Sequence, residues 1–388
     1  MSTTRLDIYD FFLRKKGEEL CGDKVKIFED NRKIIIVLSD GLGSGVKANI
    51  LATLTSEIIV KMLSENIDLE DVIATVISTL PICQTRKIAY ATFTILQLDK
   101  KTYDFQIVNF DNPPVFFFRK EKLIQIEYTD FVFADKKIKM FQDQLKLDDL
   151  LVIISDGVLY AGLGTKLNFG WGWNNIADFI KKKILETQPT SQAIVESLIE
   201  QTYKLYNGDI GDDATVISIF NRAKKSIIIF TGPPENEEND FKIVKKLLEF
   251  PGRKIVCGGT TGTIVGRYFN KEPEVDISTI TREVPPIAYL PGIDLLTEGI
   301  LTMSKTLEIL KKTNFDISQE LKKNRNGALL LANEIIMADE INFIVGRKIN
   351  EYYQNPNLPQ NISIRINLIK EFAQVLIDKK KEVSIEYV

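Results

Sequence analysis

The stretch KIIIVLSDGLGSG, residues 33–45, joins a run of branched aliphatic residues to an aspartate and a glycine-rich loop. Lys33–Leu38 predicts a buried strand, because a short apolar run bounded by turn residues is typical of a strand covered on both faces. The glycines that follow let the backbone approach a partner closely. Asp40 is therefore a turn residue, part of a phosphate-binding loop or a metal ligand, and each alternative needs different residues elsewhere.

Asp40 shares its setting with three other acidic residues in the first half of the chain. Each lies beside a glycine near the end of a predicted strand: Asp23 in CGD, Asp156 after DLLVIIS (149–155), and Asp212 in GDDAT before the strand 214–220. If these strands share a sheet, the four carboxylates converge at one edge.

Clustered carboxylates raise one another's pKa values unless a cation neutralises them. Oxygen ligands select hard cations such as Mg²⁺ and Mn²⁺, and a pair of such ions activates water and holds a phosphoryl group. A single Asp-Gly after a strand is more often a simple turn. Here, however, two predicted strands end in Ser-Asp-Gly and a Gly-Asp-Asp precedes a third. DGLGSG matches neither GxGxxG nor a nucleotide-binding P-loop. The pattern favours metal-dependent phosphoryl hydrolysis.

The composition narrows the choice of chemistry. The 388 residues suggest two or three domains, and the net charge of -3 gives no sign of nucleic-acid binding. The N-terminus lacks a signal peptide, no apolar run suits a membrane span, and the three cysteines show no CxxC spacing, so we expect a cytoplasmic protein. The chain has no histidine, which excludes Ser-His-Asp and Cys-His catalysis and histidine-ligated zinc.

Two domains are expected. Residues 1–222 mix helices (46–63, 68–80, 174–185, 191–206) with hairpin strands (88–98, 105–110, one strand over 115–128), which indicates an α+β domain with an antiparallel sheet. Residues 225–388 have strands 226–230, 254–257 and 287–290, each before a glycine-containing turn and a helix. That alternation predicts a smaller α/β domain with a more parallel sheet.

SDGLGSG (39–45), SDG (155–157) and GDDATV (211–216) together resemble the metal-dependent protein phosphatase 2C superfamily, in its stage II sporulation protein E branch. The resemblance covers roughly residues 15–222. It implies an antiparallel β-sandwich flanked by helices, an αββα arrangement, with two Mn²⁺ or Mg²⁺ ions at one end. It also implies a phosphoserine/phosphothreonine protein phosphatase that hydrolyses its substrate with a metal-activated water.

The resemblance assigns roles to individual residues. Asp40 would bridge the two ions and the Gly41 carbonyl would bind one of them, while Asp156 and Asp212 would bind the other. Asp23 would complete the site, directly or through water. Asp40 and Asp156 are the expected catalytic residues. Asp213 is expected to make supporting contacts or to begin the strand.

Two positions depart from the branch, which has methionine where this chain has Leu42 and Ala214. Eukaryotic relatives carry a histidine at the first of them, thought to act as a general acid, so another acid or a water must protonate the leaving group. Alanine at position 214 is expected to change only the packing there and to leave the metal-binding residues unaffected. The implied substrate is a small phosphorylated bacterial signalling regulator, such as an anti-sigma-factor antagonist.

The second half lies outside the resemblance. Its sharpest feature is CGGTTG (257–262), where Gly258, Gly259, Thr260, Thr261 and Gly262 form either a ligand-binding turn or a tight turn in which threonine caps a helix. This half could sense a metabolite, recruit the phosphoprotein or form a homodimer. A non-catalytic regulator whose C-terminal domain binds a small phosphorylated ligand is therefore the alternative to an enzyme.

Overall fold

The computed structural model describes residues 4–79, 91–133, 136–186, 190–348 and 360–388. The chain divides into two compact units, Met1–Ala223 and Lys224–Val388. Residues 88–90 of the strand expected over 88–98, and residue 80 of the helix expected over 68–80, lie outside the described ranges. No helix in those ranges has both the length and the apolar character needed to cross a lipid bilayer.

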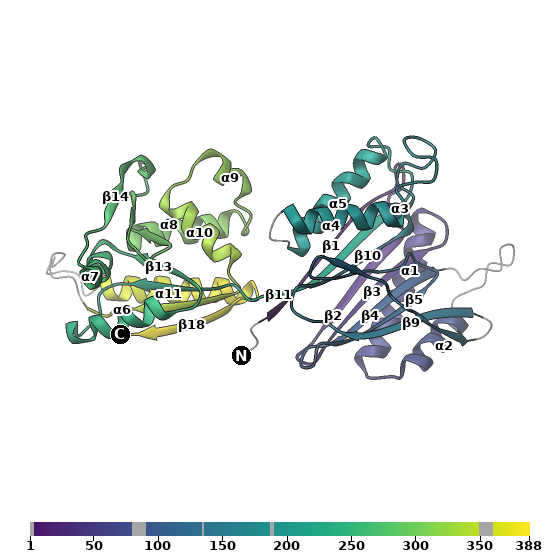
Figure 1. Ribbon diagram of the computed structural model, residues 1–388, viewed down its shortest axis with the longest axis horizontal. Coiled ribbons are helices and arrows are strands. Elements are labelled where there is room, and N and C mark those ends of the chain that lie inside the picture. Colours follow the sequence, from purple (N-terminus) through teal and green to yellow (C-terminus); the bar gives the residue numbers. More distant parts are fainter. Residues whose placement is uncertain (1–3, 80–90, 134–135, 187–189, 349–359) are drawn as a thin grey trace. The chain divides into compact units, whose positions relative to one another are not determined.

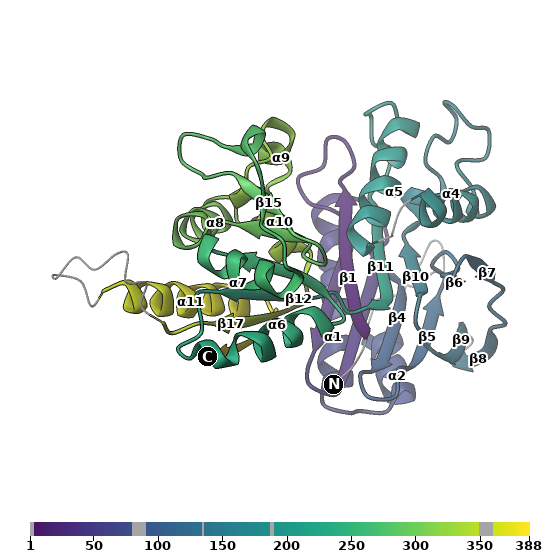
Figure 2. The same ribbon diagram turned by 60° about the vertical axis from the view of Figure 1, so that its left-hand side comes forward.

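The first unit is built from two antiparallel sheets, the second of which contains KIIIVLSDG. In spatial order, the first sheet consists of β1 (Thr4–Leu13), β11 (Ala214–Ala223), β10 (Asp149–Ile154), β6 (Phe116–Arg119) and β7 (Lys122–Ile124). The second consists of β2 (Asp23–Glu29), β3 (Lys33–Gly41), β4 (Ala91–Asp99), β5 (Asp104–Phe110), β9 (Lys136–Gln144) and β8 (Thr129–Phe133). Figure 2 shows β1, β11 and β10 side by side.

Helices cover the outer faces of both sheets, which confirms the expected helix-flanked sandwich (Figure 1). The helices of this unit are α1 (Gly45–Ser64), α2 (Leu69–Thr79), α3 (Asp156–Leu159), α4 (Trp173–Glu186) and α5 (Ser191–Leu205). α1 and α2 pack on the sheet that contains β3, and α4 and α5 pack on the other.

Strand β3 is apolar along its length because both of its faces are buried. Ile34, Ile36 and Leu38 belong to the core between the two sheets, whereas Ile35 and Val37 pack toward α1 and α2. This alternation, with a period of two residues, places every second side chain of β3 between the sheets. Asp40 continues the inward series at the end of the strand.

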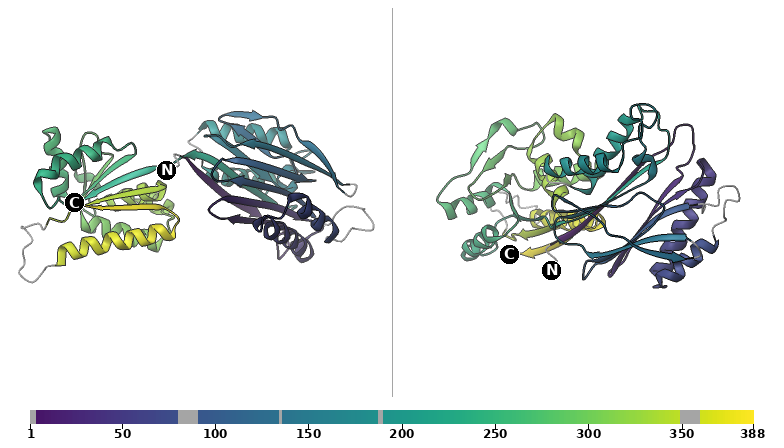
Figure 3. Two further views of the ribbon diagram at one scale, coloured as in Figure 1. Left: turned by 90° about the horizontal axis from the view of Figure 1, so that it is seen from below. Right: turned by 45° about the vertical axis from the view of Figure 1, so that its right-hand side comes forward.

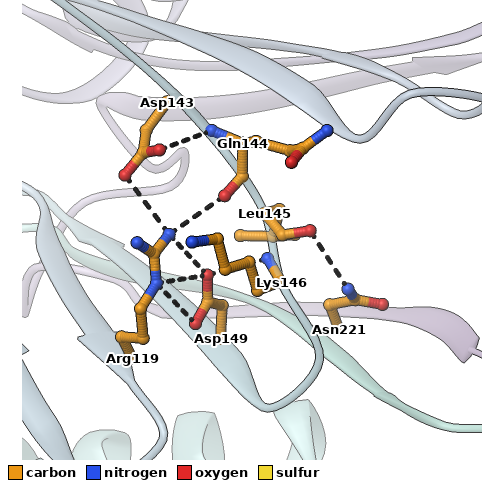
Figure 4. A network of polar contacts seen from close by, with 7 residues as sticks. All are labelled: Arg119, Asp143, Gln144, Leu145, Lys146, Asp149 and Asn221. Atoms are coloured by element: carbon orange, nitrogen blue, oxygen red, sulfur yellow. Dashed lines mark hydrogen bonds and ion pairs between the residues drawn. The ribbon is translucent and has the colours of Figure 1, made fainter.

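A network of polar contacts around the half-buried Arg119 joins the strands at the end of β10 farthest from Asp156 (Figure 4). Arg119 on β6 donates through Nε and Nη2 to the fully buried Asp149, at 3.0 to 3.2 Å, and through Nη2 to Asp143 at 3.2 Å. Asp149 also accepts from the Lys146 amide at 2.8 Å, and the amide group of Asn221 donates to the Leu145 carbonyl at 3.4 Å. The network holds β6, β10, β11 and the end of β9 in register.

The second unit contains a seven-stranded sheet. Its strands lie in the order β14 (Glu274–Asp276), β15 (Ile287–Tyr289), β16 (Leu295–Thr297), β13 (Arg253–Cys257), β12 (Ser226–Thr231), β17 (Glu340–Val345) and β18 (Glu382–Tyr387). The five strands from β16 to β18 are parallel. Numbered along the chain they have the order 3-2-1-4-5, that of a doubly wound dinucleotide-binding sheet.

Helices lie on both faces of this parallel sheet (Figure 3, left). They are α6 (Asp240–Glu249), α7 (Gly259–Phe269), α8 (Ile300–Lys312), α9 (Ser318–Lys323), α10 (Gly327–Met337) and α11 (Gln360–Asp378), with short 3₁₀ turns at Glu237–Asn239 and Ile277–Thr279. α6 and α7 cover one face, and α8, α10 and α11 cover the other.

Two sequence expectations about strands were wrong. The strand expected over 115–128 divides into β6 and β7, because the chain turns at Lys120, whose φ is 57°. The strand at 287–290 does not begin a parallel βα unit, since β15 pairs antiparallel with β16. The third parallel strand is the three-residue β16, and α8 follows it. Its apolar run, Leu295-Leu296, is too short to stand out as a strand.

Candidate active site

The strand alternation brings acidic side chains of both sheets to the same end of the sandwich. Asp23 lies directly opposite Asp40 in the β2–β3 pair. Asp156 follows β10, and Asp213 precedes β11, the neighbouring strand of the other sheet. The amide of Ser155 donates to the Thr215 carbonyl at 3.0 Å, so the two loops stay together at the strand ends.

A hydrogen bond crosses from one sheet to the other at this site. Thr215 Oγ1 on β11 donates to Asp23 Oδ2 on β2 at 2.6 Å. Asp23 is 6% exposed, and burial raises the pKa of its carboxyl group, with smaller contributions from the charges of Asp213 and Asp156. The hydrogen bonds from Thr215 and Ser155 act in the opposite direction and favour the charged form.

Asp40 lies among the other acids. Burial raises the pKa of Asp40 most, and the negative charges of the other four acids of the cluster, Asp23, Asp156, Asp212 and Asp213, raise it further. Burial also raises the pKa of Asp156, whose side chain is hydrogen-bonded to Asp40. That hydrogen bond favours the charged form of Asp156 and partly offsets the effect of burial.

Asp212 is the most open member of the cluster. Its side chain is 51% exposed and lies 3.8 Å from Lys15 Nζ. Burial still raises the pKa of Asp212, and the lysine partly offsets that effect.

Asp213 has a structural role here. Its Oδ1 accepts from the Lys15 amide at 2.9 Å, and its Oδ2 accepts from the Gly22 amide at 2.7 Å. The Gly41 amide then donates to the Gly22 carbonyl at 3.1 Å. Asp213 thus attaches the segment before β2 to the loop before β11, and it carries Asp23 with that segment.

The glycines after Asp40 and Asp156 allow close backbone approach. A Cβ atom at Gly41 would lie 2.0 Å from the Ala48 carbonyl oxygen on α1, and one at Gly157 would lie 2.0 Å from the Asp213 carbonyl oxygen. In each SDG motif the glycine therefore lets a neighbouring backbone pack directly beside the aspartate. Tyr206 OH donates to the Gly157 carbonyl at 2.8 Å and fixes that loop further.

The donor chemistry of this cluster fits a hard divalent cation. It offers carboxylate oxygens whose pKa values are raised, which is the arrangement that a cation relieves. Within the described ranges, however, no three or more Asp, Glu, Cys or His side chains already form a ligand set for a metal ion. The ligand roles of Asp23, Asp40, Gly41, Asp156 and Asp212 accordingly stay predictions, although the structure gathers the four acids.

The residues singled out in the second unit differ in their surroundings, and their role in binding a ligand stays a prediction. Thr261 is buried, and its Oγ1 accepts from the Gly232 amide at 3.0 Å. A Cβ atom at Gly262 would lie 3.1 Å from the Leu296 side chain, so this glycine serves helix packing. Gly258 precedes α7 with φ 128°, and Thr260 is exposed. Of the five residues expected to bind a ligand, Gly259 alone is among those lining the large cavity in this unit.

Sequence comparison places the first unit in a known family. The family model described as Stage II sporulation protein E (SpoIIE) matches residues 30–220. Those residues form a domain of this family. Stage II sporulation protein E of Bacillus subtilis (strain 168) is 26% identical over 211 residues, which are 53% of this chain and 24% of that protein. The Priestia megaterium protein of the same name is 25% identical over 208 residues, 52% of this chain and 34% of that protein.

The chain thus spans about a quarter to a third of the length of these curated relatives. Among solved structures, the PP2C phosphatase domain with a fragment of the regulatory domain of SpoIIE from Bacillus subtilis is 23% identical, with a TM-score of 0.49. That match covers 57% of this chain and 64% of the other. The SpoIIE domain of the present chain contains Asp40, Asp156, Asp212 and Asp213.

Sequence reasoning gave no role to Lys15, Ser155, Thr215 or Tyr206. Thr215 could have been predicted from the sequence. Strand alternation directs Thr215 and Ile217 of β11 toward the other sheet, on the same side as Asp213 just before the strand. Lys15 and Tyr206 come from segments far from the motifs, and no local pattern marks them. Ala214 packs in the core beneath α4 and α5, in agreement with a packing change at that position.

Proposed function

We propose that this protein is a metal-dependent phosphoserine/phosphothreonine protein phosphatase. The observation that carries the proposal is the convergence of Asp23, Asp40, Asp156 and Asp212 at one end of the SpoIIE domain, where burial raises all four carboxyl pKa values. Such a group of acids is costly to the fold without a cation, and buried or clustered charges of this kind concentrate at functional sites.

Asp40, Asp156 and Asp212, with the Gly41 carbonyl, would hold two Mn²⁺ or Mg²⁺ ions, and Asp23 would bind directly or through water. The ions would lower the pKa of a water molecule and offset the charge of the phosphoryl oxygens. Asp40 lies between the sheets, within the influence of the other acids. Thr215 orients the Asp23 carboxylate, and Asp213 fixes the segment that presents Asp23. With no histidine in the chain, a carboxyl group or water protonates the leaving serine or threonine oxygen.

The substrate we propose is a small phosphorylated signalling regulator, of the kind represented by an anti-sigma-factor antagonist. Family membership of residues 30–220 supports this choice. The second candidate function is a non-catalytic regulator. The observation in its favour is that no ready-made ligand set of acids is present in the part of the chain that the structure describes.

Turnover of p-nitrophenyl phosphate and of a phosphoserine peptide with Mn²⁺ distinguishes a phosphatase from a non-catalytic regulator. We expect Asp40→Asn and Asp156→Asn each to lower kcat by about a hundredfold or more, because each removes charge that the transition state requires. The control is Asp209→Asn, an exposed acid nearby in sequence that pairs with Lys16 at 3.0 Å. It should retain full activity. Undetectable turnover by the wild-type protein with Mn²⁺ and with Mg²⁺, or undiminished turnover by both cluster variants, would contradict the proposal.

A further inference from the structure

The second unit contains a cavity of about 780 Å³ beside the carboxyl ends of β13 and β16. This volume lies in the range of about 300–1,000 Å³ that is typical of small-molecule sites. α7 forms one wall through Gly259, Thr263 and Arg267. The segment from Asn270 to Val275 and parts of β15 and β16 form the others. Open α/β sheets bind ligands at the carboxyl ends of their strands.

Backbone segments are in close contact at the usual ligand position of such a sheet. The strand order reverses between β12 and β17. There, a Cβ atom at Gly346 would lie 2.1 Å from the Pro233 carbonyl oxygen, so the two backbones are in contact. Arg365 Nη1 also donates to the Gly346 carbonyl at 3.0 Å. The cavity lies beside the adjacent strands instead.

Charged side chains line the cavity without pairing. Arg267, Lys271, Glu272 and Glu298 form no ion pair with any residue of the described ranges. Other charged side chains of the unit do form ion pairs, as Arg253 does with Glu334 at 2.5 Å and Lys305 with Glu283 at 2.8 Å. Glu298 Oε2 accepts from the Gly299 amide at 3.4 Å, and Arg267 is near enough to Glu237 and Asp240 to act on their pKa values. Charged side chains that line a cavity and form no close ion pair can still contact a ligand.

The charges are separated along the cavity. Gly259 and Glu298 lie together, since a Cβ atom at Gly259 would lie 3.3 Å from Glu298 Oε1. Arg267 is eight residues further along α7, which places it roughly 12 Å away at 1.5 Å per residue. Lys271 follows the end of the helix. One end therefore carries two cationic side chains, Arg267 and Lys271, with Glu272 beside them, and the other end presents the carboxylate of Glu298.

Apolar groups line the space between these ends. They are Pro273, Val275, Pro286, Ala288 and Leu296. An elongated ligand fits this order if it has an anionic group at one end, a flat apolar body, and a hydrogen-bond donor at the other. A nucleoside phosphate whose base carries an exocyclic amine has these three parts.

We propose that this cavity binds such a nucleoside phosphate, and that adenosine monophosphate (AMP) represents the class. Arg267 and Lys271 hold the phosphate, the apolar residues contact the base, and Glu298 accepts from its amino group. This binding function goes beyond the phosphatase proposal and is independent of it.

Isothermal titration calorimetry on the full chain with a chelator present tests the proposal, since divalent ions are then absent from the acid cluster. We expect AMP to bind more tightly than adenosine, which lacks the phosphate, and than inosine monophosphate (IMP), which lacks the amine. Arg267→Gln should weaken AMP binding about tenfold or more, because hydrogen bonds to charged groups contribute about 1.5–3 kcal/mol. The same variant should leave adenosine binding unchanged. Glu298→Gln should reduce the preference for AMP over IMP.

The control Arg325→Gln removes an exposed arginine of the same unit that lies outside the cavity lining, and it should bind AMP like the wild type. Asp40→Asn should also bind AMP unchanged. Equal binding of AMP and adenosine, equal binding of inorganic phosphate and AMP, or AMP binding that is lost in Asp40→Asn would overturn the proposal. Phosphatase activity without AMP binding would overturn this inference and leave the proposed function intact.

Discussion

At the scale of single residues, the acids that meet could be identified from the sequence, but their protonation could not. Asp40 is found by its position, because it continues the inward series of Ile36 and Leu38 and ends beside a glycine. How far its pKa rises depends on burial and on four acids, of which Asp156, Asp212 and Asp213 come from segments more than a hundred residues away. That burial exists only after the second sheet has packed.

The raised pKa values predict that the acid cluster destabilises the metal-free protein as the pH rises. In the unfolded chain the carboxyl groups ionise near their ordinary pKa of about 3.9, whereas in the folded protein Asp23, Asp40, Asp156 and Asp212 hold their protons to higher pH. Between those limits the unfolded state releases more protons, so the free energy of unfolding falls with rising pH. Metal-free stability should therefore decrease from pH 5 to pH 8.

The variant Asp40→Asn tests whether the acid cluster lowers the stability of the metal-free protein at high pH. At pH 8 with a chelator, we expect the variant to unfold roughly 2–4 °C or more above the wild type, and this difference should shrink at pH 5. Mn²⁺ should stabilise the wild type more than the variant, because ligand binding to the folded state raises its stability. Thermal unfolding followed by circular dichroism measures both effects, with Asp209→Asn as the control. A variant less stable than the wild type at pH 8 would refute the idea.

At the scale of elements, the sequence predicts long apolar strands well and short or mixed ones poorly. β3 and β10 are continuous apolar runs, and each ends in Ser-Asp-Gly. β1 was not anticipated, because TRLDIYDFFL mixes charges with apolar residues; it nevertheless pairs with β11 along ten residues. The break between β6 and β7 was missed because Lys120-Glu121 contains neither glycine nor proline. In such segments the partner strand decides the structure.

The contact between Gly157 and Asp213 predicts a large effect of a small change. In Gly157→Ala the new methyl group would lie 2.0 Å from the Asp213 carbonyl oxygen, so the loops that present Asp156 and Asp213 must separate. We expect a loss of about 1–3 kcal/mol in the free energy of unfolding, the usual effect of overpacking. Phosphatase activity should fall as well.

Gly211→Ala is a matched control for Gly157→Ala, because its methyl group would meet only the ring of Tyr206, at 3.1 Å. Chemical denaturation of both variants measures the difference. Equal stability of Gly157→Ala and the wild type would show that the two loops can move apart at no cost.

At the scale of the whole molecule, the division into two units follows from their separate cores. The first unit buries apolar residues between its sheets and beneath its helices, and the second does so on both faces of its parallel sheet. The sequence indicates the same change, from hairpins to alternating strands and helices, near residue 222. It does not predict which strands of the second half pair in parallel, because β16 has only three residues.

We therefore expect each unit to fold when produced alone. Residues 1–223 and 224–388 each contain whole sheets, and the cut falls between the last residue of β11 and Lys224. Lys224 pairs with Glu382 and Glu340 inside the second unit, so the cut leaves that cluster in one piece. Each fragment should unfold cooperatively in denaturant, with a midpoint close to one transition of the full chain. The first fragment should retain Mn²⁺-dependent turnover and the second should retain AMP binding. A second fragment that folds cooperatively but binds AMP only when the first is present would show that the cavity in residues 224–388 is not a complete site.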